Sequence, residues 1–177
     1  MPNIYHSLLI GSSKEKVYSA ISSQSGLSAW WTPHTKANAE PGSIARFSFG
    51  PDYFKEMRIV KLTPFEEVQW HCITGAHEWI GTDISFHLVS GDKETLRKMH
   101  PELEGQIEQL VYDSGTLLIF HHKGWETYSP MFAECNYTWG QFLRSLKLLC
   151  ETGKGNHGHI SIEYNILIFL LININLV

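Results

Sequence analysis

The residues most able to do chemistry are the adjacent histidines His121 and His122, in the stretch HHKGW at 121–125. This stretch follows the apolar run TLLIF, so we expect both histidines on a β-strand. Neighbouring side chains of a strand point to opposite faces, and the two imidazoles therefore cannot line one site. Metal ligands on strands need i, i+2 spacing or a neighbouring strand. The pair predicts no metal centre and leaves a single histidine as a candidate site residue.

The alternation of this strand does not by itself decide which histidine faces the interior. Leu118 and Phe120 share a phase with His122, whereas Leu117 and Ile119 share one with His121. An inward-facing histidine is more often a hydrogen-bonded core residue than a catalyst.

Other catalytic and cofactor motifs are missing from the sequence. It contains no G-x-S-x-G elbow, no P-loop and no H-E-x-x-H. Its 3 cysteines have no C-x-x-C spacing, which argues against a zinc site or a disulfide framework. A formal charge of −4 without a basic cluster argues against nucleic acid as a partner. We therefore predict no catalytic residue, no metal and no cofactor, and expect a cytoplasmic protein.

The first half of the chain reads as a strand, two short helices and a strand meander. We expect a strand at 3–10, a helix that begins at Ser12 or Ser13, and a second helical piece that ends near Trp31. Alternation then predicts strands in SIARFSFG (43–50) and FKEMRIVKLTPF (54–65), the second ended by Pro64.

Residues 66–88 predict a hairpin around Gly75 and Ala76. The register that sets Trp70 opposite Thr82 gives one apolar face and one mainly polar face. The apolar face holds Val68, Trp70, Cys72, Ile80, Ile84 and Phe86. The other holds Gln69, His71, Trp79, Asp83, Ser85 and His87.

Residues 89–115 interrupt the meander with a charged segment. Leu96, Met99 and Leu103 have helical spacing in it. We interpret the segment as a solvated, helix-containing insertion, with a lid over a cavity as the alternative.

The strongest helical pattern covers about 130–152. Ser129 is the expected N-cap, Pro130 lies in the first turn, and Gly153 is the expected stop. An apolar stripe recurs every three or four residues, at Phe132, Cys135, Trp139, Phe142, Leu146 and Leu149. A long one-sided helix must cover an apolar surface, and only the sheet offers one. The predicted fold is α+β, a curved antiparallel sheet around a long C-terminal helix.

The order of the predicted strands and helices, together with several local motifs, resembles the helix-grip fold of the START-like (SRPBCC) superfamily. The motifs WW at 30–31, PGSIARFSFG at 41–50, TLLIFHHKGW at 116–125 and FLRSLKLLCETGKG at 142–155 resemble the activator of heat-shock-protein-90 ATPase homologue branch. The insertion is longer than that branch usually carries. The resemblance implies an apolar cavity between sheet and helix, and it favours the phase that turns His122 toward this cavity. It does not imply a single activity.

Twelve residues are the candidate lining of that cavity. Besides His122 and Ile84 they are all aromatic: Trp30, Trp31, Phe47, Phe49, Trp70, Phe86, Phe120, Trp125, Trp139 and Phe142. A filled core and a pocket for a flat apolar ligand both fit this aromatic set. We favour a non-enzymatic protein that binds a small apolar molecule, and a stress-related role is one candidate setting for this binding. The alternatives are a chaperone partner, as an activator of heat-shock-protein-90 ATPase, and a cyclase-like enzyme that uses His122. Oligomerisation stays open.

After the polar, glycine-rich stretch GKGNHGH, the composition of the chain becomes mainly apolar. Residues 158–177 hold an apolar run, 166–172, that is shorter than the roughly 20 residues a membrane span needs. We expect a domain over 1–157 and a tail at 158–177 that it does not need for folding. A membrane partner is not expected.

Overall fold

The computed structural model describes residues 1–156 of the chain. The predicted tail lies outside the described residues, and the domain boundary at 157 stays a prediction. Within the described part, no helix combines the length and the apolar character needed to cross a membrane.

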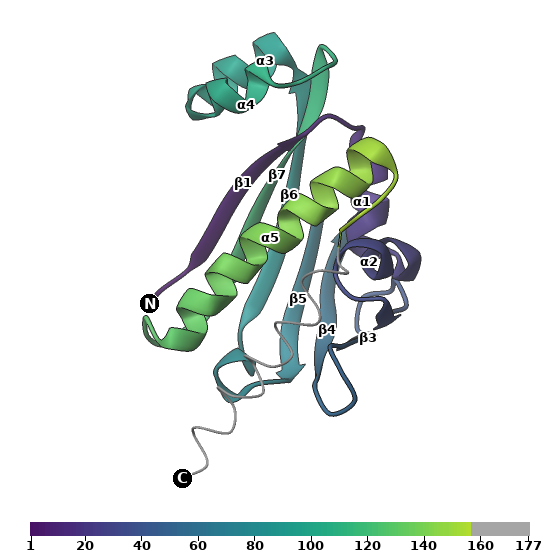
Figure 1. Ribbon diagram of the computed structural model, residues 1–177, viewed down its shortest axis with the longest axis vertical. Helices are drawn as coiled ribbons and strands as arrows, with labels where there is room; N and C mark the ends of the chain where they lie inside the picture. The colour runs from purple at the N-terminus through teal and green to yellow at the C-terminus, as the bar shows by residue number, and fades with distance from the viewer. Residues whose placement is uncertain (157–177) are drawn as a thin grey trace.

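Within residues 1–156, a single antiparallel sheet of seven strands forms the body of the protein, with the order β1-β7-β6-β5-β4-β3-β2. The strands are β1 (Ile4–Ile10), β2 (His34–Lys36), β3 (Ile44–Ser48), β4 (Phe54–Thr63), β5 (Glu67–Thr74), β6 (Asp83–Asp92) and β7 (Ser114–Lys123). The helices are α1 (Lys14–Ser22), α2 (Gln24–Trp30), α3 (Lys93–Met99), α4 (Glu104–Glu108) and α5 (Pro130–Thr152), with short 3-10 turns at His77–Trp79 (η1) and Pro101–Leu103 (η2). The sheet curls around α5 (Figure 1). The predicted α+β helix-grip fold is confirmed.

Both predicted helix starts and the predicted end of α5 follow from capping. The Ser13 side chain accepts a hydrogen bond from the Lys16 N–H, 3.4 Å, at the start of α1. The Ser129 side chain accepts one from the Phe132 N–H, 3.0 Å, at the start of α5. Gly153 ends α5 in the left-handed conformation with φ 84°, which glycine adopts without a steric penalty. Strand β2 was not predicted, because three residues carry too little alternation to be recognised.

The β5–β6 pairing differs from the predicted register. Trp70 lies opposite Ile84, not Thr82, so the register is displaced by two residues. A shift of two keeps every strand residue on its predicted face, and Val68, Trp70, Cys72, Ile84 and Phe86 are buried as expected. The prediction was wrong for Trp79 and Ile80. The turn η1 replaces strand there, so Trp79 points into the core and Ile80 is exposed.

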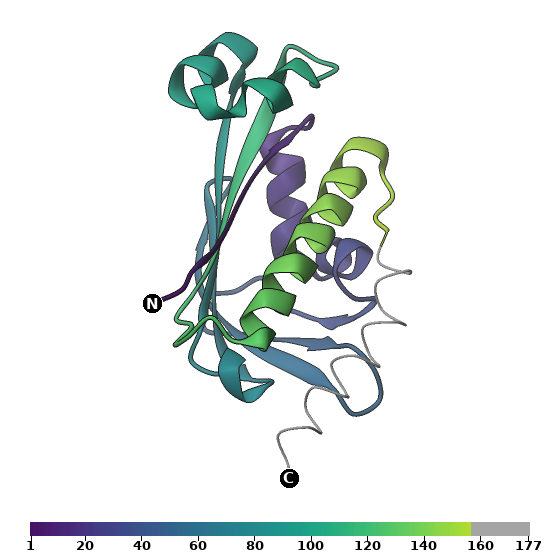
Figure 2. The ribbon, with the colours of Figure 1, turned by 60° about the vertical axis from the view of Figure 1, so that its left-hand side comes forward.

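The insertion is not a lid over the concave face. Strands β6 and β7 stay paired as far as Asp92 and Ser114, and α3 and α4 follow at their ends. Six apolar side chains form a separate small core there: Leu9, Leu96, Leu103, Ile107, Leu110 and Leu117. Leu9 and Leu117 alternate with Leu8 and Leu118, which face α5, so the insertion packs on the opposite face of the sheet. Figure 2 shows the two small helices at the far end of β6 and β7, beyond the end of α5.

Candidate functional site

The interior between the sheet and α5 is built largely from aromatic rings. Of the twelve candidate residues, eleven are buried and Phe49 is half-buried, and all lie on the concave side of the sheet or on the elements that cover it. Trp31 lies at the centre, with ring centroids 4.2 Å from Phe47, 5.7 Å from Trp70 and 5.1 Å from Trp139. The structure therefore brings the predicted residues together, where they contact one another. Their role in binding a ligand stays a prediction.

His122 is fully buried at the base of this aromatic cluster, and its hydrogen bonds define its protonation state. The Trp139 indole N–H can only donate, and it lies 3.1 Å from His122 Nδ1, so Nδ1 must accept. The Thr82 hydroxyl donates to the Trp79 carbonyl oxygen, 2.6 Å, and therefore accepts from His122 Nε2 at 2.8 Å. His122 is thus a neutral imidazole with the proton on Nε2.

The electrostatic surroundings of His122 agree with a neutral imidazole. Burial, and then the positive charge of Lys55, lower the pKa of His122 to about 3. Both ring nitrogens are occupied, so no lone pair is free to take a proton from a substrate. This disfavours the cyclase-like alternative that uses His122 as a base. The neighbouring His121 points to the other face, where its Nδ1 lies 3.2 Å from the Asn3 side-chain amide nitrogen.

Lys55 is a buried cation of the site that was not among the predicted residues. It is only 6% exposed and lies on β4, in phase with the buried Met57 and Ile59. A lysine at an inward position of an alternating strand was the available signal. Its Nζ atom lies 3.5 Å from the ring centroid of Trp79. Burial lowers the pKa of Lys55 to about 8.

Trp79 connects Lys55 to the rest of the site. Its ring lies 4.6 Å from that of His122 and 6.2 Å from that of Trp125, and its indole N–H donates to Cys135 Sγ at 3.0 Å. The Trp125 indole N–H is buried and has no acceptor among residues 1–156. Two buried donors, the Lys55 ammonium and the Trp125 N–H, therefore belong to side chains that pack on the same indole.

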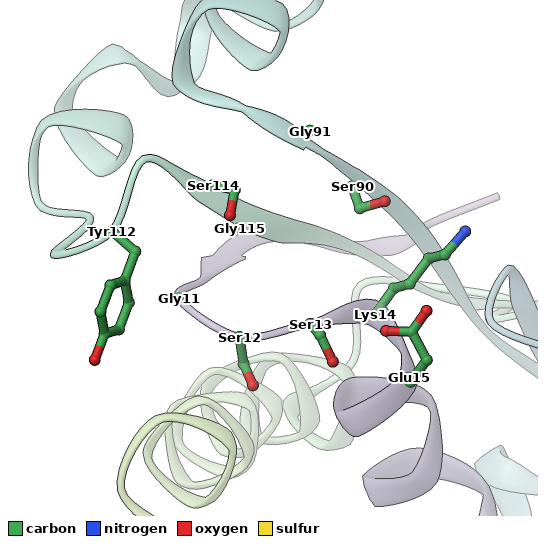
Figure 3. Close-up of a pocket in the computed structure, with 10 residues that line it drawn as sticks. All are labelled: Gly11, Ser12, Ser13, Lys14, Glu15, Ser90, Gly91, Tyr112, Ser114 and Gly115. Atoms are coloured by element: carbon green, nitrogen blue, oxygen red, sulfur yellow. The ribbon is translucent and has the colours of Figure 1, made fainter.

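Hollows are also found among the described residues outside the candidate set, and two of them are well formed. The larger, about 530 Å³, is lined by the turn from β1 into α1 and by the ends of β6 and β7. Figure 3 shows Tyr112 on one side of it and Lys14 and Glu15 on the other. The smaller, about 410 Å³, lies beside the start of α5, where the Ser129 hydroxyl donates to Glu78. None of the twelve predicted residues lines either hollow. Within residues 1–156, no three His, Cys, Asp or Glu side chains are grouped as a metal site.

This architecture defines a START-like helix-grip protein, and the comparisons with known proteins identify the branch. The profile of the family described as "Activator of Hsp90 ATPase homolog 1-like protein" matches residues 12–151. The chain belongs to this family.

Solved structures show the same fold. The Aha1 dimer from Colwellia psychrerythraea is 32% identical, with a TM-score of 0.68, over 88% of this chain and 100% of that one. Protein BH1534 from Bacillus halodurans is 18% identical, with a TM-score of 0.60, over 85% and 98%. Protein MLL2253 from Mesorhizobium loti is 14% identical, with a TM-score of 0.60, over 84% and 96%. A search of curated protein sequences gave no significant match.

Proposed function

We propose that this protein binds a small, largely apolar molecule between the sheet and α5, without catalysis, metal or nucleotide. The observation that carries the proposal is the pair of buried donors beside Trp79. Among residues 1–156, the buried Trp125 N–H has no acceptor, and no carboxylate forms an ion pair with the Lys55 ammonium. Buried polar groups are normally satisfied, and binding pockets are typically apolar with a few polar groups that orient the ligand. The expected ligand is therefore flat and apolar and carries a hydrogen-bond acceptor such as a carbonyl oxygen.

The proposal is tested with two ligands of the same shape, acetonaphthone and ethylnaphthalene. Only the first has an acceptor. Native mass spectrometry of the full chain should show one molecule bound for each, with the ketone bound more tightly. Replacing Trp125 by Phe keeps an aromatic ring and removes the N–H. A neutral hydrogen bond contributes roughly 0.5–1.5 kcal/mol, so this change should weaken ketone binding about two- to tenfold.

Ethylnaphthalene supplies the control for Trp125→Phe, because its affinity should not depend on the indole N–H. If neither compound binds, or if the substitution weakens both equally, the proposed orientation by Trp125 is wrong.

A second candidate function is activation of an Hsp90-type ATPase by a dimeric form of the protein. It is favoured by the family description and by the relative from Colwellia psychrerythraea, which is 32% identical and is described as an Aha1 dimer. Sedimentation would give the oligomeric state, and ATP turnover of Hsp90 with and without this protein would test activation. A monomer that leaves turnover unchanged would exclude this candidate.

A further inference from the structure

We infer that Lys55 captures aldehydes covalently, by condensing its amine with the aldehyde group of a mainly apolar ligand to form an imine. The inference rests on the proposed function, because the ligand must first enter the aromatic interior. It adds the chemical class of the ligand and the atom that holds it.

The position of Lys55 suits an amine that reacts inside the protein. It lies near the start of β4, and its neighbours come from the β3–β4 connection (Phe49 and Tyr53), from η1 (Trp79) and from the first half of α5 (Cys135). Its Nζ atom lies 3.5 Å from the ring centroid of Trp79, 4.8 Å from that of Phe49 and 5.5 Å from that of Tyr53. These rings would contact the apolar part of a ligand attached to Nζ. The same rings also favour a protonated imine through cation–π interactions.

Within residues 1–156, the titratable groups that act on Lys55 are neutral at pH 7, so none of them holds the amine in its charged form by ion pairing. The thiols of Cys72 on β5 and Cys135 on α5 have pKa values that burial raises to about 11. Burial also raises the pKa of the Tyr53 phenol, and His122 on β7 is a neutral imidazole. With its own pKa lowered to about 8, Lys55 carries an unprotonated amine in about a tenth of the molecules at pH 7 and in about half of them at pH 8. Buried lysines of this kind serve as imine-forming nucleophiles in enzymes.

The reaction is balanced without an oxidant or reductant. The ammonium first gives its proton to solvent, and the free amine adds to the aldehyde carbon to form a carbinolamine. Loss of water then gives the C=N bond, and hydrolysis reverses the whole sequence. Reversible capture of this kind fits a protein that binds and releases its ligand.

Naphthaldehyde with sodium cyanoborohydride tests the inference on the full chain. The reagent delivers hydride to the imine carbon, and a proton adds to nitrogen, which leaves a stable secondary amine at the lysine. Peptide mass spectrometry then locates the label. Lys61 is the internal reference, since it lies on the same strand, is exposed, and pairs with Glu67 at 2.6 Å. At pH 7–8 we expect Lys55 to be labelled roughly a hundredfold faster than Lys61 or more, because a pKa of about 8 leaves a much larger fraction of free amine than an ordinary lysine has.

Substitutions separate the two lysines. Lys55→Met should abolish the fast labelling, whereas Lys61→Met should leave it unchanged. The labelling rate at Lys55 should rise from pH 7 to about pH 9 and then level off, because its amine is by then deprotonated.

Failure of this inference can be told apart from failure of the proposed function. If ethylnaphthalene binds but naphthaldehyde labels Lys55 no faster than Lys61, capture by Lys55 is wrong and non-covalent binding stands. If neither ethylnaphthalene nor acetonaphthone binds and Lys55 is not labelled, both are wrong. Fast labelling at Lys55 without binding of the hydrocarbon would support capture and contradict a general apolar site.

Discussion

Replacing His122 by Ala should lower the free energy of unfolding by about 3–5 kcal/mol, the range seen when a large buried side chain is truncated and its partners are left unsatisfied. The imidazole is fully buried and joins β7 to two other elements. It accepts from the Trp139 N–H on α5 and donates to the Thr82 hydroxyl before β6. Its loss leaves a cavity beside Trp79 and an indole donor without an acceptor. Chemical denaturation at pH 7 measures the effect.

The matched control is His121→Ala, one residue away on the opposite face of the same strand. His121 is half-buried and contacts Tyr5 and Asn3 near the edge strand β1, so we expect a loss below about 1 kcal/mol. Equal losses for the two substitutions would contradict the assignment of the two histidines to opposite faces.

Because His122 is buried in its neutral form, the free energy of unfolding should depend on pH. Its pKa is about 3 in the folded protein and has an ordinary value of 6.5, so the unfolded chain binds the proton more readily between these values. Its contribution is therefore fully present above about pH 6.5 and is lost as the pH falls, at about 1.4 kcal/mol per pH unit. A His122→Met variant should lack this part of the slope, and His121→Ala should retain it. Identical slopes in the wild type and in His122→Met would show that His122 is not buried in its neutral form.

Replacing Lys55 by Met should raise the free energy of unfolding at pH 7 by about 1–3 kcal/mol. The gain from removing a cation whose pKa is lowered by burial is larger than the loss of the cation–π contact. Methionine has nearly the same length and needs no counter-charge. The folded pKa of Lys55 is about 8, below its ordinary 10.5, so at neutral pH the folded protein bears the cost of a buried cation that no carboxylate of residues 1–156 pairs with. Lys61→Met, on the same strand, should change stability by less than about 1 kcal/mol.

The sign of the pH effect makes this prediction specific. Between pH 8 and 10.5 the unfolded chain holds the lysine proton more readily, so the wild type gains stability as the pH rises. The advantage of Lys55→Met should therefore shrink over this interval and be smallest above it. A Met variant less stable than the wild type at pH 7 would mean that the aromatic rings more than offset the burial of the ammonium.

The sequence predicted the fold well because its signals are local and repeated. The stripe from Phe132 to Leu149 lies between a serine cap and a glycine stop, and it gave α5 the observed bounds, Pro130–Thr152. The strand phases followed from alternation, although TLLIFHHK itself was ambiguous and needed the family pattern to turn His122 inward. That choice was correct, as the burial of Leu118, Phe120 and His122 shows.

The sequence predicted less about the site, because the positions of its polar groups depend on turns, where strand alternation does not apply. Trp79 was assigned to the polar face on strand periodicity, but the turn η1 rotates its side chain inward onto Lys55. Nor could spacing show that the Trp125 N–H finds no acceptor among residues 1–156, since that depends on the hydrogen bond that Thr82 and the neighbouring His122 make with each other. Similarly, the spacing of apolar residues in the insertion predicted a helix, but it did not indicate which face of the sheet the insertion would cover.

The most direct test of the proposed function follows the indole N–H signals of the tryptophans by two-dimensional NMR during a titration with acetonaphthone. The sequence has 6 tryptophans, and the Trp125→Phe variant assigns the signal of that residue. Binding beside Trp79 predicts saturable shifts of the Trp79 and Trp125 signals, with the Trp125 proton moving downfield as it gains an acceptor. If all signals stay in place, or if they drift without saturating, the protein does not bind a carbonyl-bearing apolar ligand at this site.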